Sequence, residues 1–245
     1  MLAGCGDSRL PISLPFEAMY DGRPVDCESA AVRLNDLRLY ISEVTAVMTD
    51  GQQIGIAFIP DTDWQNDTVA LIDLESGDGA CRDGTPETNH ELQLLWPEGE
   101  VRQLKLTVGV PFDDNHADPL AAAAPLDDSA MHWHWRSGYK FLRAGVEVDG
   151  DSFWLHLGST GCEGTTGDIR ACNAPNRVTL TLEGFVAGRS AAVIHLDRLF
   201  AGIDLSDGVP SDCSSGPFET DCDAVLANLG LAAGSAMPWL TLEPR

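Results

Sequence analysis

Apolar and polar residues alternate over several short stretches of this chain, with the period expected when one face of a β-strand is buried. The alternating apolar positions are Leu37, Leu39 and Ile41; Ile54, Ile56 and Phe58; Leu104, Leu106, Val108 and Val110; Phe153, Leu155 and Leu157; Val178, Leu180 and Leu182; and Ile194 and Leu196. Asp-Gly pairs at 50–51, 78–79 and 149–150 predict tight turns. These patterns predict an all-β fold, a single β-sandwich-like domain with long loops.

Other elements are few. Helical periodicity is nearly absent, and the one helix that we expect runs from Asp223 to Leu231 with Asp223 as its N-cap. Residues 112–130 form an Ala/Pro/Asp-rich connection, and loops of that length are usually functional or mobile. We expect a short N-terminal segment over residues 1–10 and one β domain over residues 11–245, a length that can bury a substantial core.

The charge of the chain excludes several kinds of partner. It has 15 Lys and Arg against 38 Asp and Glu, a formal net charge of −23. Such a surface repels phosphate backbones and anionic lipids, so we expect no nucleic-acid partner. It suits a basic protein partner or cations, although solubility alone explains acidity equally well. No stretch approaches the roughly 18 apolar residues of a transmembrane helix, so we expect no membrane span.

Six of the seven cysteines are available for three disulfides, which point to an oxidising compartment such as the periplasm or cell surface. Many connectivities are open to six cysteines. We favour Cys27 with Cys81, Cys162 with Cys172, and Cys213 with Cys222, because the last two pairs enclose short intervals rich in turn-forming residues. The seventh, Cys5, follows Leu2-Ala3-Gly4 as in a bacterial lipobox, which predicts a lipid anchor at Cys5.

The segment Met131-His132-Trp133-His134-Trp135 is the most unusual in the chain. On a strand, Trp133 and Trp135 share one face and His132 and His134 the other. By itself the segment is more often a core tryptophan pair with two solvent-facing histidines. Imidazoles beside aromatic rings in an oxidising compartment suit copper, which binds nitrogen donors most strongly in its series.

Other kinds of site find less support. The chain has no Gly-x-Ser-x-Gly elbow, phosphate-binding loop or HExxH motif, and we expect no enzymatic activity. The acidic stretch from Asp73 to Asp78 offers oxygen ligands for calcium but lacks EF-hand spacing, and solvated turns are the commoner outcome there.

The motifs together resemble the MbnP family of methanobactin-associated copper-binding proteins. The similar segments, in order along the chain, are Asp36-Leu37-Arg38-Leu39-Tyr40, Trp64-Gln65, Ala70-Leu71-Ile72-Asp73, Gly109-Val110-Pro111-Phe112, Asn115-His116, Trp133 to Phe141, His156 to Cys162, Cys172, Asn176-Arg177-Val178, and Cys213 with Cys222. Each is weak alone, and the ordered set is specific.

The resemblance implies a maturation step and a partner. MbnP-like proteins are periplasmic or lipid-anchored and act with a MauG-like dihaem enzyme, MbnH. That enzyme oxidises the first tryptophan of a WxW motif to kynurenine, and the product binds copper as Cu(I). Carried onto this sequence, the resemblance implies Trp133 as the modified residue and Trp135 as the second tryptophan. An indole N–H offers a metal no lone pair, whereas the opened ring exposes an amine and a ketone.

We expect His116 and His156 to complete the copper site, since each lies in a matched motif. His134 and His132 rank lower because their strand direction opposes Trp133. Two other functions stay open: a carbohydrate- or protein-binding β-sandwich that uses exposed Trp133, Trp135 and Trp154, and a small copper redox enzyme.

Overall fold

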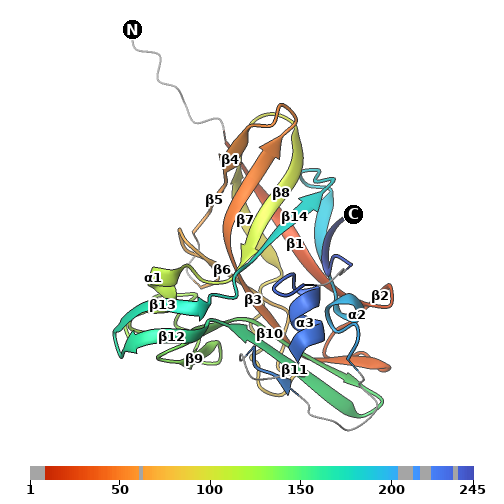
Figure 1. Ribbon diagram of the computed structural model, residues 1–245. Helices are drawn as coiled ribbons and strands as arrows, with labels where there is room; N and C mark the ends of the chain where they lie inside the picture. Colours follow the sequence, from red (N-terminus) through yellow and green to blue (C-terminus); the bar gives the residue numbers. More distant parts are fainter. Residues whose placement is uncertain (1–8, 61–62, 204–211, 216–221, 234–236) are drawn as a thin grey trace.

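The computed structural model describes residues 9–60, 63–203, 212–215, 222–233 and 237–245 as a two-sheet β-structure (Figure 1). One sheet has the strand order β17-β15-β1-β7-β5, with β2 paired to β1. Its strands are β1 (Leu10–Tyr20), β2 (Arg23–Pro24), β5 (Ala57–Phe58), β7 (Glu91–Trp96), β15 (Ser190–His195) and β17 (Leu240–Pro244). Strands β1 and β15 run parallel, and the other pairs in this sheet are antiparallel.

The second sheet is larger and is organised around the long strand β3. Its order is β14-β8-β3-β10-β11-β16, with β4 and β6 paired to β3 and β9 paired to β10. The strands are β3 (Val32–Met48), β4 (Gln53–Gly55), β6 (Ala70–Asp73), β8 (Val101–Val108), β9 (His132–His134), β10 (Gly138–Val148), β11 (Asp151–Gly158), β14 (Val178–Glu183) and β16 (Asp212–Cys213).

Strands β12 (Thr160–Thr165) and β13 (Asp168–Ala174) form a separate two-stranded hairpin. Three short helices complete the described structure: α1 (Phe112–Asn115), α2 (Leu196–Leu199) and α3 (Asp223–Asn228). None of the helices in the described ranges is long and apolar enough to cross a bilayer. The predicted all-β, sandwich-like fold is confirmed, because apolar residues of both sheets join one core cluster.

The three disulfides pair as predicted, Cys27 with Cys81, Cys162 with Cys172, and Cys213 with Cys222. Such bonds persist in oxidising compartments, which places folding of the chain outside the reducing cytosol. Residues 1–8 lie outside the described residues, and with them the predicted anchor at Cys5.

The prediction that β3 is buried on one face only is wrong for its first half. Arg38 and Tyr40 are 3% and 0% exposed, because the 112–130 connection and the segment after it cover their face. Tyr40 donates a hydrogen bond to the carbonyl of Pro125 at 2.9 Å, and Tyr139 donates to that of Leu126 at 2.6 Å. The long connection is therefore part of the packed structure at this point.

Arg38 is buried because it belongs to an ion cluster, which we define as Asp36, Arg38, Asp73 and Arg143. Arg38 donates to both carboxylate oxygens of Asp36, at 3.1 and 2.5 Å, and Arg143 Nε lies 3.1 Å from the same carboxylate. Burial raises the pKa of Asp36, and the two guanidinium groups oppose that rise. Burial also raises the pKa of Asp73 to about 7.

The expectation of solvated turns over Asp73–Asp78 is wrong at its first positions. Asp73 and Glu75 are 4% and 0% exposed. Asp73 Oδ1 accepts from the Glu75 amide at 2.8 Å, and Glu75 Oε1 accepts from the Gly77 amide at 3.1 Å. These carboxylates serve local backbone hydrogen bonds inside the protein and do not face solvent.

Three further expectations need correction. The alternating stretch Ile54–Phe58 is two short strands, because β4 pairs with β3 in one sheet and β5 pairs with β7 in the other. Strand β15 ends at His195, so Leu196 begins helix α2. Helix α3 starts at Asp223 with Cys222 in the N-cap position, and that cap makes no side-chain hydrogen bond. The disulfide at Cys222 anchors the start of the helix in place of a polar cap.

Candidate metal centre

Helix α1, strand β9 and the β12–β13 hairpin gather at one end of the molecule (Figure 1). Strand β9 pairs with the start of β10 through His134 and Gly138. The backbone of Asn115 lies so close to Gly138 that an added Cβ would come within 2.2 Å of the Asn115 carbonyl oxygen. Gly138 also has φ of +77°, which favours glycine. Helix α1, and with it the adjacent His116, is thus docked beside the strand that follows Trp133.

Trp133 and His156 meet across this end of the sheet. Their ring centroids lie 6.3 Å apart in an edge-on arrangement, and His156 is also 6.2 Å from the ring of Trp154. The Trp133 ring packs over Gly158, where a Cβ would approach its Cε3 atom to 3.1 Å. Glycine at this position therefore leaves room for the indole directly beside His156.

His156 is held as a neutral imidazole. Burial lowers its pKa to about 4, and the positive charges of Lys140 and Arg143 act in the same direction. Its Nε2 atom is buried without a hydrogen-bond partner. A neutral histidine nitrogen without a partner in a protein interior is an energetic cost unless a ligand occupies it.

His116, at the C-terminal end of helix α1, has a similar unpartnered atom. Its Nδ1 is buried without a hydrogen-bond partner, and burial lowers its pKa. Its ring stacks edge-on against Phe112 at 4.7 Å, and its Nε2 lies 3.4 Å from Cys172 Sγ. Asn115 Nδ2, which can only donate, lies 3.2 Å from Nε2, and this contact places the ring proton on Nδ1. A neutral imidazole carries one proton, so a metal at Nδ1 requires that proton to move to Nε2, where the Cys172 sulfur is a weak acceptor.

The lower-ranked histidines have other neighbours. The His132 ring lies 5.3 Å from that of Tyr139, and its pKa is lowered mainly by burial. His134 is exposed and lies 5.4 Å from Trp135, and its Nδ1 accepts from the Arg136 amide at 3.3 Å. Trp135 follows β9 in a turn, with Arg136 4.9 Å above its ring, so the strand alternation ends before it.

Asn115 is a positioning residue to which the sequence reasoning gave no role. It is 2% exposed, its Oδ1 accepts from the Tyr139 amide at 2.8 Å, and its Nδ2 donates to the Ser137 carbonyl at 3.0 Å. Its position directly before His116 was the available signal. Asn115 ties the His116 segment to the strand that carries the WxW motif.

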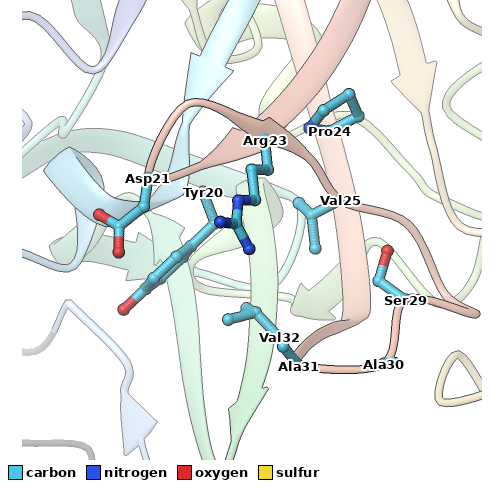
Figure 2. Close-up of a pocket in the computed structure, with 9 residues that line it drawn as sticks. All are labelled: Tyr20, Asp21, Arg23, Pro24, Val25, Ser29, Ala30, Ala31 and Val32. Carbon is cyan, nitrogen blue, oxygen red and sulfur yellow. The ribbon is translucent and has the colours of Figure 1, made fainter.

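The described part of the chain offers two further features, a group of possible metal ligands that includes His116 and a pocket far from it in sequence. Within the described ranges, one group of side chains has ligand atoms close enough to hold a single metal ion, and it consists of His116, Cys162 and Cys172. The Asp73–Asp78 stretch considered for calcium does not form such a group. A pocket of about 480 Å³ lies beside the β1–β2 turn, where Tyr20, Arg23 and Val32 face the same space (Figure 2). None of its lining residues is a predicted site residue.

We define the His-Trp site as Trp133, His116 and His156. It offers two imidazoles, each with a buried nitrogen that lacks a partner, and a half-buried indole that lies 6.3 Å from the ring of His156. That donor set fits a soft, low-coordinate ion such as Cu(I) better than calcium, which prefers several oxygen ligands. The indole itself contributes no ligand atom until it is chemically changed.

Comparisons with known proteins agree with one another. The structure is similar to that of MbnP from Methylosinus trichosporium, with a TM-score of 0.81 and 28% sequence identity over 96% of this chain and 98% of that chain. No curated protein matches the sequence. The family model described as MbnP matches residues 9–215, from the first strand of the sandwich to the end of its second sheet. On this match the chain belongs to the MbnP family.

Proposed function

We propose that this protein is an extracytoplasmic copper-binding protein that takes up one Cu(I) at the His-Trp site after Trp133 is oxidised to kynurenine. The single observation that carries the proposal is the pair of buried, unpartnered imidazole nitrogens, His156 Nε2 in a ring 6.3 Å from that of Trp133, and His116 Nδ1 on the segment docked against Gly138. Burial lowers the pKa of both imidazoles, which favours the neutral form that binds a metal.

The position of Trp133 suits chemical maturation. It is half-buried, so part of the residue is exposed at the surface, and its ring packs over Gly158 beside His156. Opening the indole to kynurenine supplies an amine and a ketone, either of which can serve as a third ligand beside the two imidazoles. A MauG-like dihaem enzyme such as MbnH is the proposed oxidant, and the net charge of −23 favours a partner with a basic docking face.

The proposed role is binding, without catalysis, in copper homeostasis in the periplasm or at the cell surface. The tryptophan-platform alternative has less support, because Trp133, Trp135 and Trp154 are each half-buried and pack against histidine or arginine side chains. Turnover of a reductant by the copper-loaded protein would instead identify a redox enzyme.

The test is co-production with the partner dihaem enzyme, followed by intact-mass and copper analysis. We expect the mass of kynurenine at Trp133, new near-ultraviolet absorbance and one bound copper per chain. The Trp133→Phe variant should show no kynurenine mass and should bind no copper. The matched control is Trp154→Phe, which also neighbours His156 and should keep both properties. Full copper binding by Trp133→Phe would contradict the proposal.

A further inference from the structure

The Cys162–Cys172 disulfide lies directly against the His116 imidazole. The two cysteines face each other across the β12–β13 hairpin, and the bond joins them. His116 Nε2 is 3.4 Å from Cys172 Sγ, and one ligand atom from each of the three residues lies within 4.8 Å of the others. Phe112 packs against the same imidazole at 4.7 Å, which limits its rotation. The ring nitrogen and the two sulfurs thus form a compact triangle.

A disulfide sulfur is a poor metal ligand, whereas a thiolate is a strong, soft one. We infer that Cys162 and Cys172 form a redox-gated second copper site, in which reduction of the disulfide lets both sulfurs and His116 Nε2 bind one Cu(I). This site uses the opposite imidazole nitrogen from the His-Trp site. It does not require oxidation of Trp133, so it can be tested independently of the proposed function.

The three disulfides differ in their accessibility to a reductant. Cys27, Cys81, Cys213 and Cys222 are each at most 3% exposed and belong to the core cluster. Cys162 is 6% exposed, Cys172 is half-buried, and neither belongs to that cluster. A thiol must reach a sulfur atom to exchange with it, so Cys172 is the sulfur that a reductant meets first.

The hairpin also tolerates opening of the bond. Strands β12 and β13 pair with each other and form a sheet separate from the two core sheets. Their backbone pairs run from Thr160 with Ala174 to Thr165 with Asp168, on both sides of the disulfide. Reduction therefore frees two sulfurs within a paired hairpin and leaves the core strands joined.

The reductant is a dithiol of the kind that reduces protein disulfides. Its thiolate attacks Cys172 Sγ, the bond to Cys162 Sγ breaks, and Cys162 leaves as a thiolate. The second thiol of the reductant then displaces Cys172, so the cysteine pair gains two electrons and the reductant becomes a disulfide. Binding of Cu(I) removes the remaining thiol protons, and the imidazole binds as a neutral ligand.

The experiment uses the full chain with Trp133 unmodified, as verified by intact mass. Limited reduction with a dithiol is followed by alkylation and peptide mass analysis, and a parallel sample receives Cu(I) buffered by a chromophoric chelator. Among the six disulfide-bonded cysteines, we expect Cys162 and Cys172 to be alkylated first. We also expect one Cu(I) to bind only after reduction, and X-ray absorption at the copper edge to show sulfur neighbours.

Two variants separate the site from general thiol binding. Cys162→Ser/Cys172→Ser should lose this copper, whereas Cys213→Ser/Cys222→Ser, which removes a disulfide of similar loop length, should retain it. His116→Ala should weaken the reduced site by at least about tenfold. Earlier alkylation of another cysteine pair would overturn the proposal. So would copper binding that is equal before and after reduction, or unchanged in His116→Ala.

Discussion

The ion cluster and the His-Trp site are both buried polar groups, and they differ in how their polar atoms are paired. Asp36 accepts two hydrogen bonds from Arg38 and lies 3.1 Å from Arg143, so charges of opposite sign compensate each other. His116 Nδ1 and His156 Nε2 have no partner at all. Buried polar groups that pair with one another support the fold, whereas neutral imidazole nitrogens left without a hydrogen bond are available to bind a ligand.

The same strands connect the two regions. Arg143 on β10 is opposite His156 on β11 in the strand register, and its guanidinium lies 5.6 Å from the ring of Trp154. The charge of Arg143 compensates Asp36 and also lowers the pKa of His156. The ion cluster therefore stabilises the sheet and helps to keep the neighbouring imidazole neutral.

The largest effect that we expect is on stability, from Arg38→Met. This change leaves the buried Asp36 carboxylate without its two hydrogen bonds from Arg38 and should lower the free energy of unfolding by about 3–5 kcal/mol. Urea denaturation measures the loss. A decrease below about 1 kcal/mol would put this cluster in the range of exposed ion pairs and remove the contrast with the His-Trp site.

The second effect is on the affinity for copper. His116→Ala and His156→Ala, made in protein that carries kynurenine, should each weaken Cu(I) binding at the His-Trp site by at least about tenfold. Competition against a Cu(I) chelator measures the affinity. His90→Ala is the control, because His90 is exposed and lies outside the site. If both variants bound Cu(I) with wild-type affinity, the assignment of His116 and His156 as copper ligands would be wrong.

The third effect is a pH dependence of the metal-free protein. The pKa of His156 falls from 6.5 to about 4 on folding, so the unfolded chain binds more protons between these values. Stability should therefore decrease as the pH falls from about 6.5 to about 4. The contribution is at most about 3 kcal/mol, and partial access of solvent reduces it. Urea denaturation across this range should show a shallower slope for His156→Gln, and equal slopes would contradict the assignment.

The smallest effect should come from an ion pair at the surface. Arg170 and Asp168 lie 3.3 Å apart with side chains 75% and 64% exposed. Arg170→Met should therefore change the free energy of unfolding by less than about 1 kcal/mol, and the change should diminish further in high salt. Measured beside Arg38→Met, it separates the effect of burial from the effect of charge.

Local pattern was sufficient for much of the fold. The alternation at Phe153, Leu155 and Leu157 corresponds to β11, and Asp149-Gly150 forms the turn that joins it to β10. Pattern failed at Arg38 and Tyr40, since a polar or amphipathic residue in an alternating stretch normally faces water. Here a connection more than 70 residues further along the chain covers them, as the hydrogen bond from Tyr40 to Pro125 shows, with a sequence separation of 85.

The candidate site divides in the same way. Trp133, His116 and His156 were identifiable from motifs, and their roles as copper ligands stay predictions. The sequence could not show that two imidazole nitrogens lack partners, because burial depends on the whole fold. Nor could it show that Trp133 packs over Gly158 or that His116 contacts Cys172, because these residues are far apart in sequence. Asn115 was adjacent to a named residue, yet its hydrogen bond to Tyr139 spans 24 positions.

By itself, the sequence determined the β class through local periodicity. It favoured the three cysteine pairs among many, and its resemblance to the MbnP family marked Trp133, His116 and His156 as candidate site residues. Tertiary structure alone decided which polar residues compensate one another and which remain unpaired. The reason is physical: burial and hydrogen bonding depend on segments that the chain brings together from a distance, so neither can be read from one strand.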